Sequence, residues 1–197
     1  MSGSLCRRFG PGRLPYASRR DVGGGIAMAA TALLAIACWF GASGLLLATD
    51  TATAVTNATD LEFVVAFGAL FAPFAVLTSF LLGTRCWRAI GRNESGTDPD
   101  PNPILGSLLG TCTAVGSMIG GSIGLGVVFA GLSLLSGTLA LGEVAVVFFL
   151  TVVSAFLFAV VFAGWVIVPL GAFGGWYHER AKTATTERTR AIGSGKL

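Results

Sequence analysis

The stretch VAVVFFLTVVSAFLFAVVFAGWVIVPLGAFGGW, residues 144–176, contains no charged residue and no histidine. An α-helix needs about 20 apolar residues to cross a bilayer, so this stretch exceeds the length of one crossing. Dividing it would leave two pieces too short to span, and it therefore predicts one tilted or interfacially extended helix. Three more apolar stretches lie at residues 26–48, 63–82 and 104–135. The sequence thus predicts four transmembrane helices.

The overall composition agrees with a membrane protein. Of 197 residues, 53% are hydrophobic and 12% are charged, and the mean hydropathy is +0.77. In soluble domains roughly a quarter of the residues are charged, so we expect this chain to lie in a membrane rather than in water. The four spans leave no segment long enough for a soluble domain. The net charge of +3 combines a basic inner face with an outer face that carries only acids. It therefore does not indicate nucleic-acid binding, and we expect no nucleic-acid partner.

Basic residues orient the predicted spans, because Lys and Arg accumulate on the cytoplasmic side of membrane proteins. All 13 fall in three patches, before residue 26, between residues 83 and 92, and after residue 179. The predicted outer segments carry only acids, namely Asp50, Asp60, Glu62 and Glu143. We therefore expect both termini in the cytoplasm and a location in the plasma (inner) membrane. Eleven Arg against two Lys, with abundant Ala, Gly and Val, favour a prokaryotic gene rich in G and C.

These spans predict an all-α, polytopic fold of two helical hairpins. The expected organisation is a basic disordered cytoplasmic tail (1–22), a first transmembrane hairpin (23–92), a Pro/Asp cytoplasmic linker (93–103), a second, longer hairpin (104–178) and a cytoplasmic tail (179–197). The second helix of each hairpin contains a proline, which removes a backbone hydrogen bond. Pro73 predicts a kink, and Pro169 predicts a break near the inner surface.

The tails and loops carry weaker signals. Five Arg residues in the first 20 positions favour contact with anionic lipid head groups, while an organelle transit peptide and a twin-arginine export signal remain as alternatives. Asn57-Ala58-Thr59 matches the glycosylation acceptor pattern. Cys86 lies at the inner end of a span, where acylation competes with an idle thiol as its interpretation.

Glycines and hydroxyl residues make residues 104–135 the most distinctive span. Gly116, Gly120 and Gly124 are four positions apart and share one helix face, which predicts close helix packing there. The partner is another span of this chain, a second copy, or a polar solute that passes along the Ser and Thr hydroxyls. The pair Gly120-Gly121 also leaves open whether this span is continuous or broken.

Groups that carry chemistry are few. No Asp, Glu, Lys, Arg or His lies deep in a predicted span, which disfavours ion-coupled transport. The only histidine, His178, is expected at the membrane interface, and no catalytic constellation is visible. We expect no enzyme activity, no cofactor and no metal site, because a structural metal needs about four Cys or His ligands. Glu62 and Glu143 form either an acidic mouth or two solvated helix ends.

The sequence therefore predicts a multi-pass membrane protein that acts through helix association. It would form a homo-oligomer or a subunit of a membrane complex, with the glycines of residues 104–135 as the packing face. The alternative is a small permease or channel for an uncharged solute, lined by the Gly, Ser and Thr residues of the same span. The solute, the biochemical activity and the number of subunits are not defined by the sequence.

Overall fold

A computed structural model describes residues 20–49, 58–92, 102–137 and 139–193. These residues form four α-helices and no strand: α2 (Arg20–Ala48), α4 (Ala58–Arg92), α5 (Pro103–Leu135) and α6 (Leu141–Gly193). Each contains a segment long and apolar enough to cross a membrane, namely Asp21–Ala48, Glu62–Ala89, Pro103–Leu135 and Leu141–Ala181. The predicted all-α class with four membrane-spanning helices is thereby confirmed. Asn57 and most of the linker lie outside the described residues.

Local sequence explains where α5 and α6 begin. The Asn102 side chain accepts hydrogen bonds from the backbone N–H groups of Ile104 and Leu105 at 3.1 and 3.2 Å. Pro103 occupies the first turn, where its missing N–H leaves no bond unmade. After α5, Gly137 takes a φ of 63°, a left-handed conformation that glycine adopts without strain. The Glu143 carboxylate accepts from the Ala140 N–H at 2.8 Å and so caps α6.

The helices are longer and less interrupted than predicted. The first helix begins at Arg20, within the predicted tail, and α6 runs through Pro169 to Gly193 with no break near the inner surface. In the same way, α5 is continuous through Gly120-Gly121. Lipid offers no water to satisfy backbone groups that a break would release, so a continuous helix is favoured within the bilayer.

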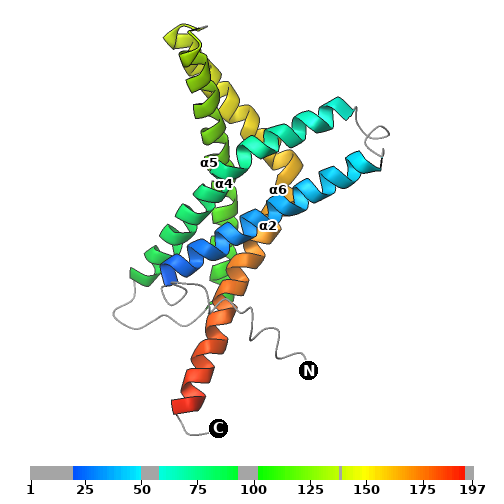
Figure 1. The fold of residues 1–197 in the computed structure, drawn as a ribbon. Coiled ribbons are helices and arrows are strands. Elements are labelled where there is room, and N and C mark those ends of the chain that lie inside the picture. The colour runs from blue at the N-terminus through cyan, green and yellow to red at the C-terminus, as the bar shows by residue number, and fades with distance from the viewer. Residues whose placement is uncertain (1–19, 50–57, 93–101, 138, 194–197) are drawn as a thin grey trace.

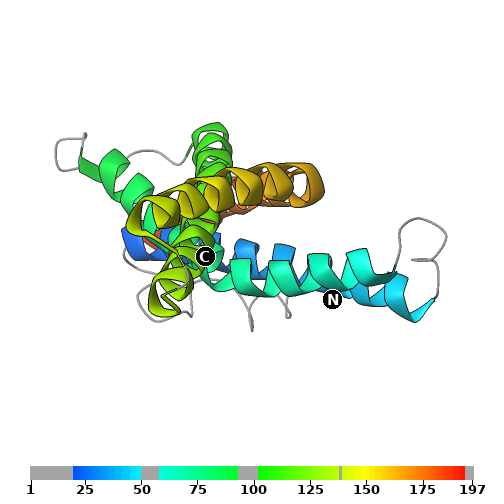
Figure 2. The ribbon, with the colours of Figure 1, turned by 90° about the horizontal axis from the view of Figure 1, so that it is seen from above.

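The four helices form two antiparallel pairs that cross each other. Contacts join α2 to α4 and α5 to α6 most extensively, and α4 also packs against α5. Figures 1 and 2 show that the pairs diverge toward two separate tips, at the starts of α4 and α6. At the opposite end, all four helices come together where α4 and α6 carry the exposed residues Arg85, Arg88 and Arg180. We call this end the basic end.

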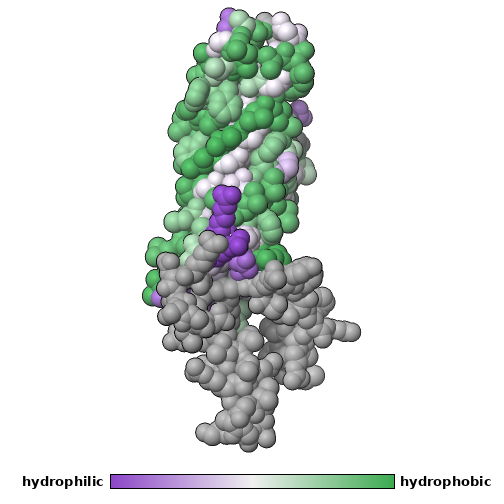
Figure 3. Space-filling view, turned by 90° about the vertical axis from the view of Figure 1, so that its left-hand side faces the viewer, coloured by the Kyte–Doolittle hydropathy of each residue, from purple (hydrophilic) through white to green (hydrophobic). Residues whose placement is uncertain are grey.

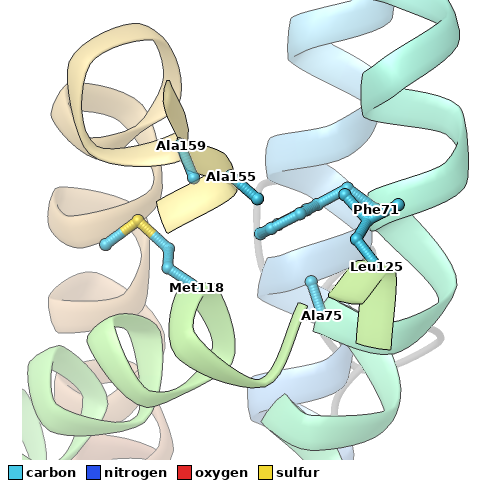
Figure 4. Close-up of a cluster of buried hydrophobic side chains, with 6 residues drawn as sticks. All are labelled: Phe71, Ala75, Met118, Leu125, Ala155 and Ala159. Carbon is cyan, nitrogen blue, oxygen red and sulfur yellow. The ribbon is translucent and has the colours of Figure 1, made fainter. Parts of the chain in front are cut away.

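A small core holds the pairs together at mid-height. Figure 4 shows the ring of Phe71 directed from α4 toward Ala155 on α6, with Met118 and Leu125 contributed by α5. Small side chains such as Ala155, at 1% exposure, let the helices approach closely. Most large apolar side chains instead face outward, and the face in Figure 3 is largely hydrophobic, with its main group of hydrophilic residues in the lower part and a few at the upper tip and one edge. Such a surface suits contact with lipid.

Candidate functional site

A tryptophan, a glutamate and a histidine meet at the basic end. The indole N–H of Trp87 on α4 donates a hydrogen bond to Glu179 Oε1 on α6 at 2.8 Å. Trp87 is fully buried and Glu179 is 3% exposed. The His178 ring packs edge-on against the indole, with centroids 5.4 Å apart. These three residues, which we call the Trp87 cluster, link the α2–α4 pair to the α5–α6 pair.

Glycines on the other two helices make room for this cluster. A Cβ at Gly24 on α2 would lie 2.6 Å from the Trp87 ring, and one at Gly106 on α5 would lie 2.6 Å from the Glu179 Cγ. Any larger residue would therefore push α2 off the indole or α5 off the glutamate. All four helices thus contribute to the Trp87 cluster, two with side chains and two with bare backbone.

Sequence reasoning missed this cluster. The sequence predicts Glu179 at the start of the cytoplasmic tail (179–197), beside Arg180. The structure instead buries its carboxylate, while Arg180 stays exposed over the Trp176 ring, 4.9 Å from the centroid. The sequence does contain a glycine, Gly24, that lies beside the Trp87 indole in the structure. Matching these two residues requires knowing how the helices pack. A buried carboxylate held by a hydrogen bond anchors helices and offers a polar contact inside an apolar bundle.

The predicted packing glycines lie against α4 of the same chain. A Cβ at Gly116, Gly120 or Gly124 would collide with Leu82, Thr78 or Phe74 respectively. A second set, Gly106 and Gly110, faces α6, where added Cβ atoms would meet the carbonyl oxygens of Gly175 and Gly171. Any role of the predicted face in joining separate copies stays a prediction.

The hydroxyl groups of α5 mostly bond to the helix itself. Thr111 donates to the Ser107 carbonyl at 3.1 Å, Ser117 to Ala114 at 2.7 Å and Ser122 to Met118 at 2.8 Å. Ser117 and Ser122 are also buried, at 3% and 0% exposure. These hydroxyls are satisfied locally, so they present few free donors to a solute beside α5.

Glu62 and Glu143, which the sequence allows to form one acidic opening, lie at different tips of the molecule. Glu62 lies near the start of α4 and Glu143 near the start of α6, and these starts diverge in both views (Figures 1 and 2). Both side chains are exposed. Among the residues that the structure describes, no three His, Cys, Asp or Glu side chains are grouped so that they could hold a metal ion.

Fold and surface together define a multi-pass α-helical membrane protein with lipid-facing helices. Comparison with known proteins adds no closer relationship: no protein-family model matches the chain, and neither the curated proteins nor the solved structures contain a significant match. The features that bear on function are therefore those of the molecule itself.

Proposed function

We propose that the protein is not an enzyme and acts by helix association, forming a homo-oligomer in the plasma (inner) membrane. Partnership with a different membrane protein is the closest variant of this proposal. Both termini would lie in the cytoplasm, where the basic end contacts anionic lipid head groups. The three patches of Lys and Arg support this orientation.

The observation that carries the proposal is a row of small residues on the outward face of α2. Ala30, Ala37, Gly41, Gly44 and Ala48 recur three, four or seven positions apart, and all are exposed. A Cβ added at Gly41 or Gly44 would have nothing within 4 Å. In lipid, such rows let two helix backbones approach closely, which is the main source of packing energy between transmembrane helices. We call these five residues the α2 face.

The α2 face is a better candidate for self-association than the glycines of α5, because those glycines already pack against another helix. Gly116, Gly120 and Gly124 already contact α4, so a second copy would have to displace that helix. The α2 face needs no such rearrangement. A row of this kind is also self-complementary, as a symmetric dimer requires.

Disulfide cross-linking within native membranes tests the proposal. Ala37→Cys, in a chain whose four native cysteines are replaced by serine, should form a dimer on mild oxidation, because a disulfide needs Cα atoms within about 7 Å. Adding Gly41→Leu should abolish the cross-link by separating the backbones. Gly131→Leu is the matched control, since a Cβ there also has open space, and it should leave the cross-link intact.

Mass measurement in mild detergent separates the outcomes. A monomer together with no cross-link would refute self-association. A cross-link to a different protein, again lost with Gly41→Leu, would identify the chain as a subunit of a membrane complex.

A permease for an uncharged solute is the second candidate, and it follows from the Gly, Ser and Thr residues of α5. It has less support because α4 and α6 cover most of these glycines and the buried hydroxyls of Ser117 and Ser122 bond to backbone. Solute flux into proteoliposomes that is blocked by Gly120→Ala, with no change in subunit number, would favour the permease over helix association.

A further inference from the structure

An apolar crevice lies between the two helix pairs at the middle of the spans. It has a volume of about 70 Å³ and is bordered mainly by α2, α4 and α6, with Ser117 of α5 completing the wall. Aromatic rings dominate its wall: Trp39, Phe40, Phe67, Phe71, Phe158 and Phe162. Small residues, including Ala72 and Ala163, leave the space between the rings. Figure 4 shows part of this wall, with Phe71 and Ala75 of α4 facing Ala159 of α6.

The crevice narrows toward the basic end. A second cavity of about 10 Å³ adjoins it there and shares four of its lining residues, Ala32, Ala35, Ser117 and Ile167. That volume is close to the minimum for one water-sized sphere, about 10–15 Å³. Beyond it, Gly174 packs directly against Thr31 and lies close to Met28. The crevice is therefore blind at its inner end.

The hydroxyl groups in the walls are already bonded to the main chain. Ser117 donates to the Ala114 carbonyl at 2.7 Å, and Ser79 of the inner cavity donates to the Met28 carbonyl at 3.1 Å. Thr31 likewise donates to the Met28 carbonyl at 2.9 Å. Bound water needs two to four polar partners, so these walls favour hydrocarbon over water or a polar solute.

We propose that the crevice binds one acyl chain of a membrane phospholipid. Its rim reaches the outer apolar surface, because Phe162 lines the crevice and is also 44% exposed. Whatever enters therefore comes from the bilayer. A helix is about 10 Å across and is too wide to enter the crevice, whereas part of a single methylene chain fits a narrow blind slot while the rest of that chain stays in the bilayer. The crevice face of α2 lies opposite the α2 face, so lipid binding does not depend on self-association.

Quenching by brominated lipid tests the proposal, because Trp39 lines the crevice. The protein is placed in phosphatidylcholine vesicles whose acyl chains are dibrominated at mid-chain, with unbrominated vesicles as the reference. Trp165→Phe and Trp176→Phe remove the indoles near bulk lipid, and Trp87 is fully buried. The emission that disappears with Trp39→Phe then reports the crevice alone. We expect bromine to quench this emission.

Filling the crevice provides the decisive comparison. Ala163→Phe should abolish the quenching of Trp39, whereas Ala145→Phe, on an exposed part of the same helix outside the crevice, should leave it unchanged. If the first variant fails to fold, Ala72→Leu fills the crevice from α4. Absence of quenching in the unfilled protein, or quenching that persists after filling, would overturn the proposal. Native mass spectrometry supplies a second readout: retained phospholipid should be lost with Ala163→Phe and kept with Ala145→Phe.

Discussion

The Trp87–Glu179 hydrogen bond has an unusual position for a membrane protein. It joins two buried side chains on different helix pairs, at the basic end, where Gly24 of α2 and Gly106 of α5 also lie close to the pair. Hydrogen bonds to charged or strongly polar groups contribute more than neutral ones, and a buried group left without its partner is costly. We therefore expect this bond to help set how the two pairs cross.

Trp87→Phe should lower the free energy of unfolding by about 1–3 kcal/mol, because it removes the N–H that Glu179 Oε1 accepts. Glu179→Gln keeps an oxygen acceptor and should cost less. Trp165→Phe is the matched control: its indole is exposed to lipid and bonds only to the Phe162 carbonyl of its own helix. Thermal unfolding in detergent checks the three variants. Equal stabilities of Trp87→Phe and Trp165→Phe would contradict a stabilising role for the hydrogen bond.

At the scale of elements, α5 and α6 pack backbone against backbone. Gly106 and Gly110 on α5 face Gly171 and Gly175 on α6, and each would clash if it carried a Cβ. Further along α5, Gly126 faces Val152 and Phe148 instead. The close contact is thus confined to the part of the hairpin nearer the basic end, which also positions Glu179 beside Gly106.

Gly175→Ala should destabilise the protein by about 1–3 kcal/mol, the usual cost of overpacking a tight interface. Its Cβ would meet the Gly106 carbonyl and lie 3.1 Å from the Gly110 Cα, and neither atom belongs to a flexible side chain. Gly131→Ala on α5 has open space and should change stability by less than about 1 kcal/mol, with a slight gain because alanine favours helix. Chemical unfolding followed by circular dichroism distinguishes the two. An unchanged midpoint for Gly175→Ala would show that the helices separate at no cost.

At the scale of the whole molecule, the charge distribution and the fold agree. Exposed arginines lie at the basic end, and Glu62 and Glu143 lie near the starts of α4 and α6, at the two tips. Between them the described surface is largely apolar (Figure 3). This arrangement suits one bilayer crossed four times, and the bias of Lys and Arg toward the cytoplasm predicts the basic end on that side.

Cysteine labelling in intact cells tests that orientation. In a chain without native cysteines, Ser136→Cys at the turn after α5 should react with a membrane-impermeant maleimide added outside. Ala89→Cys, close to the basic end of α4, should react only after the cells are opened. Both positions are exposed. Labelling of Ala89→Cys in sealed cells would contradict the predicted topology and place the basic end outside the cell.

The four spans and their helical state follow from the sequence alone, because twenty consecutive apolar residues in lipid have no alternative to a helix that satisfies its own backbone. Orientation is predicted on the same local grounds. Which helix packs against which face cannot be predicted in this way, because it depends on the residues of other helices that lie opposite. Nothing in the spacing of Gly116, Gly120 and Gly124 distinguishes α4 from a second copy. Only the tertiary structure placed α4 against them, buried Glu179 with Trp87, and left the α2 face and the apolar crevice open to lipid.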